Sequence, residues 1–210
     1  ERDWALTRPP PLFESYNVAP TTAVPVVRER EGERTCEFIR WGLVPFWAKG
    51  IPPKLSTINA RVETIATAAT YRTPWKRGQR CILPVAGFYA WQLAGAGYRQ
   101  PHFIRLIDRS VFGFAALWDR SEGEDDDVVE SVAIIRVPAN ELMAAMQPLD
   151  AHMPAILRRK DYDTWLRGTP VQAKAVLQPY PAARMQADAV SPRINSTAVD
   201  DVGLIRRAGR

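Results

Sequence analysis

The sequence predicts a single α+β domain over residues 1–210, in which a curved or barrel-like, mostly antiparallel sheet is flanked by short helices. Strand-like apolar runs occupy the first two thirds of the 210 residues, and short helical patterns follow them. No strand–helix–strand unit repeats, which disfavours a parallel α/β sheet. With 46% hydrophobic residues, a chain of this length can bury a sizeable core.

The first half of the chain is predicted to be mainly extended. Residues 6–29 are rich in proline, which removes backbone donors and blocks helix interiors. A strand is expected over residues 35–47, broken at Pro45. The Ala/Thr-rich segment after Arg61 is predicted to form a helix that ends before Pro74, because the residue preceding a proline disfavours helical angles.

The remaining elements follow from apolar runs and from capping residues. Residues 80–91 form one nearly continuous apolar run of strand length. Residues 101–119 predict two strands around a turn, and residues 128–137 predict another. Short helices are expected over 138–146, over 161–168 with Asp161 as cap and Gly168 as stop, and over 169–177 with Thr169 as cap and Pro170 in the first turn.

Composition excludes several functional classes. No uncharged apolar stretch of about 18 residues is present and no secretory leader opens the chain, so a cytoplasmic protein without membrane contact is expected. Cys36 and Cys81 lack the spacing of a zinc site, and no GxxxxGK[ST], GxGxxG, HExxH or GxSxG motif occurs. We therefore expect no metal and no cofactor.

Positive charge is concentrated in one segment. Between Arg40 and Arg80 eight lysines and arginines face a single acid, Glu63, a local balance of +7 in a chain of net charge +5. Aromatic residues are interleaved with these cations. This composition is typical of a groove that follows phosphates and stacks unpaired bases. The alternative is a solvated basic face over ordinary core aromatics.

Motifs along almost the whole chain resemble one family. The segments "YNVAPT", "RWGLVPFW", "INARVET", "RCILPVAGFYAW", "FGFAALWD", "PANELM", "MPAIL", "PYPA" and "VSPRINS" occur in this order. In order and spacing they resemble the SOS response-associated peptidase (SRAP) family. The combination of "INARVET" with "CILP" and "GFY" about twenty residues later is its most specific part.

The resemblance implies a protein that recognises abasic sites in single-stranded DNA. In the family, a cysteine exposed as the N-terminus attacks the sugar aldehyde with its amine and thiol, and a thiazolidine crosslink forms. An α-amine pKa near ~8 leaves part of the amine neutral, which suits this chemistry. The family name reflects self-processing peptidase activity. Neither Cys36 nor Cys81 stands near the start of the chain, so crosslinking is expected only if a cysteine precedes Glu1.

The family's other catalytic positions are only partly matched. Asn59 corresponds to the asparagine of its "INAR" motif, whereas Ala90 replaces the glutamate of "GFYEW". Counting back from the "MP" pair places Asp150 at the family's histidine position and His152 at its arginine position. The preceding segment is about three residues longer than usual, so His152 is the alternative occupant.

The residues expected to bind DNA are better matched. The resemblance assigns Arg61 to a phosphate contact and an aromatic segment to base stacking. It places "YNVAP" and "GFYAW" along the same cleft. The expected DNA-binding residues are Arg61, Trp41, Phe46, Trp47, Asn17 and Trp91.

Three functions therefore stand as hypotheses. The first is a crosslinking protein for abasic sites in single-stranded DNA, expected to be a monomer. The second is a non-catalytic single-stranded DNA binder that has lost the proton-transfer groups, as Ala90 suggests. The third is a protease acting in trans through Asp150 and His152, for which the sequence offers no nucleophile.

Overall fold

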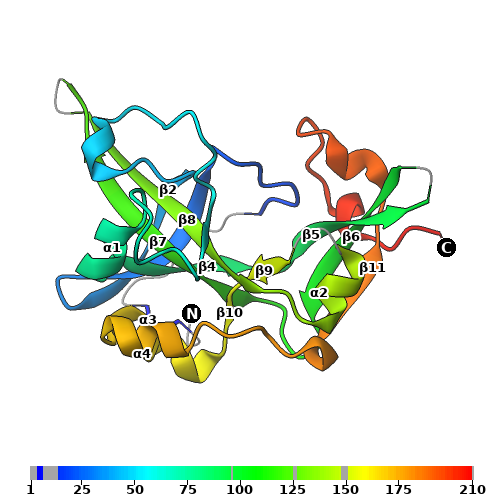
Figure 1. Ribbon diagram of the computed structural model, residues 1–210. Coiled ribbons are helices and arrows are strands. Elements are labelled where there is room, and N and C mark those ends of the chain that lie inside the picture. Colours follow the sequence, from blue (N-terminus) through cyan, green and yellow to red (C-terminus); the bar gives the residue numbers. More distant parts are fainter. Residues whose placement is uncertain (1–3, 7–13, 96, 125–126, 148–150, 210) are drawn as a thin grey trace.

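Two sheets organise the computed structural model, which describes residues 4–6, 14–95, 97–124, 127–147 and 151–209 (Figure 1). The strands of the larger sheet are β1 (Ala23–Arg30), β2 (Glu33–Trp41), β3 (Asn59–Arg61), β4 (Arg80–Val85), β7 (Phe112–Glu122), β8 (Val128–Pro138), β9 (His152–Pro154) and β10 (Ile156–Leu157). The smaller sheet contains β5 (Phe88–Ala94), β6 (Tyr98–Leu106) and β11 (Met185–Ala189).

The larger sheet closes on itself. β7 pairs with β4, β4 with β1, β1 with β2, β2 with β8, and β8 with β7 again. Most of these pairs are antiparallel, whereas β2 and β3 run parallel to β8. Closure pairs the strand edges that an open sheet would expose. The α+β class and the barrel-like, mostly antiparallel sheet are thus confirmed.

Short helices lie around these sheets (Figure 1). The α-helices are α1 (Arg72–Arg77), α2 (Glu141–Met146), α3 (Tyr162–Arg167) and α4 (Pro170–Ala175). The 3-10 helices are η1 (Phe46–Ala48), η3 (Arg159–Asp161), η4 (Ala182–Arg184), η5 (Pro192–Asn195) and η6 (Val202–Ile205). None of the helices that the structure describes is long and apolar enough to cross a membrane.

One buried core joins the two sheets to the helices. It includes Ile82 and Leu117 of the barrel, Ile104 of the smaller sheet and Trp165 of α3, all fully buried. The indole Nε1 of Trp165 donates to the backbone oxygen of Cys81 at 2.8 Å, which fastens α3 onto β4. Burial of each large apolar side chain stabilises the fold by about 1.5–3 kcal/mol.

The prediction of one strand over residues 80–91 is wrong. The run divides at Gly87 into β4 and β5, which belong to different sheets. A Cβ atom at Gly87 would lie 2.3 Å from Cζ of Phe103 and 2.6 Å from the backbone oxygen of Ile104. The chain can therefore cross between the sheets this closely only with glycine at this position.

The prediction of a helix ending before Pro74 is also wrong. Residues 62–71 form successive turns, and α1 begins at Arg72 with Pro74 in its first turn. Proline is tolerated there because the first amides of a helix have no intrahelical acceptor. The strand expected over 35–47 ends early, at Trp41, where Gly42 adopts a φ of +123°.

The predicted caps are confirmed at one helix and only partly at the other. Thr169 and Gln172 form a reciprocal capping box at the start of α4, with Pro170 in the first turn. Asp161 occupies the N-cap position of α3, but its side chain makes no capping hydrogen bond. Gly168 ends α3 as expected.

Candidate nucleic-acid interface

Trp41 and Asn59 lie along one edge of β8. Trp41 pairs with Val132 and Asn59 pairs with Ile134, both in parallel register. The indole Nε1 of Trp41 donates to the backbone oxygen of Ile58 at 3.0 Å, directly before Asn59. The two predicted site residues are thus brought together, although 17 positions separate Trp41 from the oxygen that it binds.

The loop between them is fastened to the barrel by buried polar side chains. Ser131 Oγ accepts from the amide of Val44 at 2.7 Å, and Asp119 Oδ2 accepts from the amide of Phe46 at 2.9 Å. Ser121 Oγ accepts from the amide of Gly50 at 2.8 Å. Burial raises the pKa of Asp119. The hydrogen bonds that its carboxylate accepts from backbone amides offset only part of this effect.

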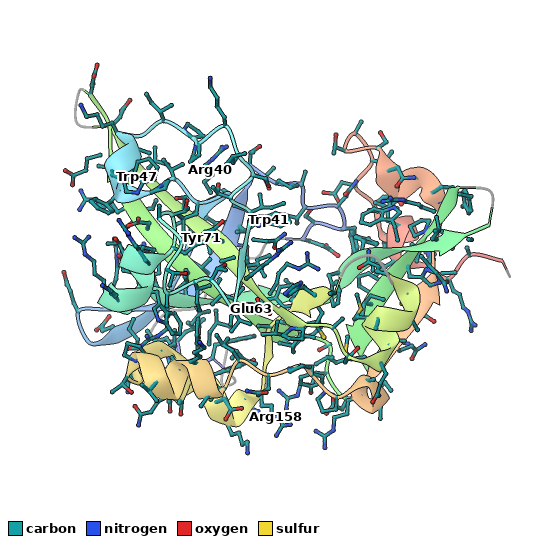
Figure 2. All side chains as sticks on the ribbon, in the orientation of Figure 1. Arg40, Trp41, Trp47, Glu63, Tyr71 and Arg158 are labelled. Carbon is teal, nitrogen blue, oxygen red and sulfur yellow. The ribbon has the colours of Figure 1, made fainter. Side chains whose placement is uncertain are left out.

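This anchored loop carries exposed aromatic and aliphatic side chains. Phe46 is 41% exposed and Trp47 is 52% exposed, both on η1, and Ile51 and Leu55 follow them at the surface. The guanidinium of Arg77 lies 5.1 Å from the Phe46 ring centroid. Figure 2 shows Trp47 at the outer edge of the barrel. Apolar side chains held at a surface by buried anchors are suited to stacking on bases.

Not all of the basic segment contributes to this surface. Arg80 is 5% exposed and donates from Nε to the backbone oxygen of Trp165. Trp75 is buried with its ring centroid 6.3 Å from that of Trp165. The alternative interpretation is therefore correct for Trp75 as a core aromatic, whereas the buried Arg80 is neither a solvated cation nor a DNA contact, and Arg61 is exposed.

The backbone of Asn59 is held by a hydrogen bond from a tyrosine. The hydroxyl of Tyr71 donates to the backbone oxygen of Asn59 at 2.8 Å. Burial raises the pKa of Tyr71 to about 12, so the hydroxyl remains a donor at neutral pH. Within the described residues the half-buried side-chain amide of Asn59 makes no hydrogen bond, which leaves its donors and acceptor for a ligand.

Glu63 and His152 meet across the end of β8. Arg61 in β3 pairs with Arg136 on one edge of β8, and Pro154 in β9 pairs with the same residue on the other edge. The Nε2 atom of His152 lies 3.1 Å from Oε1 of Glu63. The Arg136 guanidinium donates to the backbone oxygen of His152 and helps hold β9 in place.

The Glu63 carboxylate is kept ionised by its surroundings. Slight burial raises its pKa, but a hydrogen bond from its own backbone amide and the contacts with His152 and Arg61 lower it overall. The side chain of Glu63 is 49% exposed and that of His152 is 16% exposed. The pair therefore combines an accessible carboxylate with a partly sheltered imidazole, an arrangement that can orient the ring and move a proton.

The other predicted site residues lie elsewhere or outside the described residues. Asp150 is in the part of the chain that the structure does not describe. Ala90 is 2% exposed in β5 of the smaller sheet, opposite His102. Trp91 Nε1 donates to Oδ1 of Asn195 at 2.8 Å.

Asn17 joins an N-terminal segment to a segment near the C-terminus. Its Nδ2 donates to the backbone oxygens of Ser196 and Val199, each at 2.9 Å. The backbone oxygen of Tyr16 accepts from the hydroxyl of Tyr89 at 2.7 Å. Both amide donors of Asn17 are therefore engaged within the protein.

Glu63 is the site residue that sequence reasoning missed. The sequence marks Glu63 only as the single acid of the basic segment between Arg40 and Arg80. Its place in "INARVET", four residues after Asn59, was a usable signal, because a lone carboxylate among cations is ionised and available to a histidine.

Comparisons with known proteins identify the family of this chain. The family model for SOS response associated peptidase (SRAP) matches residues 3–197. The chain is 32% identical over 194 residues to the abasic site processing protein YoqW of Bacillus subtilis, covering 91% of this chain and 85% of that protein. It is 28% identical to the abasic site processing protein HMCES of Gallus gallus, and the match covers 89% of this chain and 64% of that protein.

A solved structure shows the same architecture. A protein from Bacteroides thetaiotaomicron, known by its crystal structure, superposes with a TM-score of 0.81 and 26% identity over 90% of this chain and 82% of that one. The chain belongs to the SRAP family.

Proposed function

We propose that this protein processes abasic sites in single-stranded DNA, with the lesion held beside Asn59 and a proton moved by the Glu63–His152 pair. The observation that carries the proposal is the 3.1 Å contact between Glu63 and His152 at the end of the strand pair that presents Asn59 and Arg61. The relatives named as abasic site processing proteins support the substrate.

The exposed groups favour a single strand over a duplex. Phe46 and Trp47 can stack only on bases that are not paired within a helix, and such stacking is worth about 1–3 kcal/mol per base. Arg61 is exposed beside Asn59 and can bind a backbone phosphate without reading sequence. All of these residues come from one chain, so a monomer suffices. We expect the protein to be found with the DNA of its cell.

Glu63 supports His152 in this account. An imidazole whose Nε2–H donates to a carboxylate is fixed in tautomer and orientation. His152 then exchanges a proton with the opened sugar, while the Asn59 amide hydrogen-bonds to the aldehyde oxygen or to the attacking group.

The covalent step uses an N-terminal cysteine, as the family resemblance implies. Its neutral α-amine adds to the C1′ aldehyde and water leaves, which forms an imine. The thiol then adds to the imine carbon, the imine nitrogen takes a proton, and a thiazolidine closes. In the proposed mechanism His152 gives the proton that departs with water and accepts the proton of the thiol.

A second function is supported by Ala90. The residue is a buried methyl group opposite His102, so β5 contributes no carboxylate at this point. If the Glu63–His152 pair moves no proton, the protein is a single-stranded DNA binder without chemistry. It would bind damaged and intact strands alike, with an affinity that falls steeply with salt.

Binding experiments separate these functions. Fluorescence anisotropy would compare full-length protein with Asn59→Ala on single strands that are intact or carry one abasic site. The proposal predicts tighter binding to the abasic strand, and loss of that preference in Asn59→Ala with intact-strand affinity retained. Equal affinity of the wild-type protein for both strands would contradict lesion recognition and favour the second function.

A further inference from the structure

A second cationic site lies away from Asn59 and Glu63. It is a pocket of about 660 Å³ whose lining includes Tyr180 and Pro181. Its charged lining residues are Arg109, Arg158, Arg159, Lys160 and Arg184. Figure 2 places Arg158 at the lower edge of the molecule, below Glu63. None of the lining residues is acidic, although the chain as a whole has 23 acids for 28 lysines and arginines.

Three segments that are distant in sequence form this pocket. Arg109 lies in the connection between β6 and β7, the next three cations belong to η3 and its N-cap, and Arg184 ends η4. The amide of Ile107 donates to the backbone oxygen of Arg184 at 3.1 Å, which ties the first segment to the third. Tyr180, which lines the pocket, is 3% exposed and is therefore held by the surrounding core. The fold thus fixes the shape of the pocket.

Three of the pocket cations, Arg158, Lys160 and Arg184, have little compensation among the described residues. Arg184 Nη1 lies 4.0 Å from Asp108 Oδ2, and both side chains are about half exposed. Arg158 and Lys160 make no side-chain hydrogen bond or ion pair among the described residues. Like charges gathered in one pocket repel one another, and a bound anion relieves that repulsion. Arginine guanidinium groups match phosphate geometry in particular.

We propose that this pocket binds backbone phosphates of the same single strand whose lesion lies at Asn59. This inference rests on the proposed function. The segment from His152 to Arg158 runs through β9 and β10 and links the two sites. Six residues of extended chain span at most about 20 Å, so Arg158 lies within about 20 Å of His152, and the residues that join them, 153 and 155–157, are buried.

Strand length is the variable that separates the two sites. At a stacked rise of about 3.4 Å per nucleotide, a strand of about 5 nucleotides centred on the lesion extends roughly 9 Å to either side. This reach is less than half of the roughly 20 Å that the chain segment from His152 to Arg158 can span. A strand of about 16 nucleotides extends roughly 27 Å to either side and can occupy both sites.

The experiment measures anisotropy of both strands, each with a central abasic site, as a function of salt. The test variant is Arg158→Glu with Lys160→Glu, and the matched control is Arg99→Glu with Lys174→Glu, which reverses two exposed cations outside the pocket. For the long strand, the test variant should bind more weakly, and its slope of log K against log salt should be shallower by about 1.4, or about 0.7 per lost phosphate contact. For the short strand, the affinity of the test variant should equal that of the control variant.

Other results would contradict either this proposal or the proposed function. An unchanged long-strand slope in the test variant, or an equal loss for both lengths, would overturn the proposal. Saturable binding of inorganic phosphate by calorimetry, without any length dependence of strand binding, would reassign the pocket to a free anion and overturn it too. Failure of the proposed function looks different, because the short strand would then show no preference for the abasic site in any variant.

Discussion

The carboxylate of Glu63 and the imidazole of His152 meet at 3.1 Å although 89 positions separate them in the chain. They come from opposite sides of β8, which pairs with β3 on one edge and with β9 on the other at Arg136. The parallel pairing of β3 places Asn59 and Arg61 on the same edge. One strand therefore brings together a carboxylate–imidazole pair and, on the same edge as β3, a side-chain amide that makes no hydrogen bond among the described residues. This arrangement carries the proposed function.

Trp47 is predicted to contribute to the binding of single strands. Trp47→Ala removes an indole that is 52% exposed and should weaken binding by about 1–3 kcal/mol, or roughly 5- to 150-fold. Anisotropy with an intact strand measures the effect. Tyr98→Ala is the matched control, because Tyr98 is 50% exposed in the smaller sheet. Equal losses in the two variants would contradict a specific stacking role for Trp47.

Asp119 is predicted to hold the aromatic loop. Asp119→Ala leaves the amide of Phe46 without its acceptor and should destabilise the fold by about 1–3 kcal/mol, which lowers Tm by roughly 3–10 °C for a chain of this size. Asp119→Asn retains an acceptor and should lose less. Thermal unfolding followed by circular dichroism checks both variants. A Tm for Asp119→Ala equal to that of the wild type would show that the loop does not depend on this anchor.

Glu37 is predicted to make the free energy of unfolding fall at acidic pH. Partial burial raises its pKa, but hydrogen bonds and charge from the fully buried Arg28 lower it overall. A lowered folded-state pKa means that the stabilisation is fully present above the ordinary value of about 4.3 and is lost as pH falls through the folded-state value. Glu37→Gln should therefore show a shallower decline in the free energy of unfolding below about pH 5.

Urea unfolding at a series of pH values measures this dependence. Glu33→Gln is the control, because Glu33 is exposed on the same strand and makes no ion pair among the described residues. A decline in Glu37→Gln as steep as that in Glu33→Gln would assign acid sensitivity to other carboxylates.

Local patterns predicted much of this fold. The alternating runs indicated most strands, and Thr169 and Pro170 marked the start of α4 because capping depends on residues close in sequence. Capping and strand alternation depend on neighbours within a few residues, which a sequence displays directly. Interest in the aromatic loop and Asn59 comes instead from the composition and the family resemblance, and their roles stay predictions.

What escaped prediction depends on distant contacts. The division of residues 80–91 at Gly87 follows from the close approach of Phe103, and the parallel pairing of β3 with β8 joins segments about 75 residues apart. The Glu63–His152 contact and the cationic pocket around Arg158 arise from such pairings. No local propensity records which distant segments will meet, so only the folded chain shows them.

The most direct measurement is the rate of covalent adduct formation between the full-length protein, with its natural N-terminus, and a single strand carrying one abasic site. Intact-mass analysis under single-turnover conditions would compare wild type, Glu63→Gln and the control Glu33→Gln across a range of pH. The account predicts an adduct in the wild type and in Glu33→Gln, and in Glu63→Gln a rate lower by about 10²-fold with a changed pH profile and an unchanged Tm. An adduct that forms in Glu63→Gln at the wild-type rate and with the wild-type pH profile would contradict it.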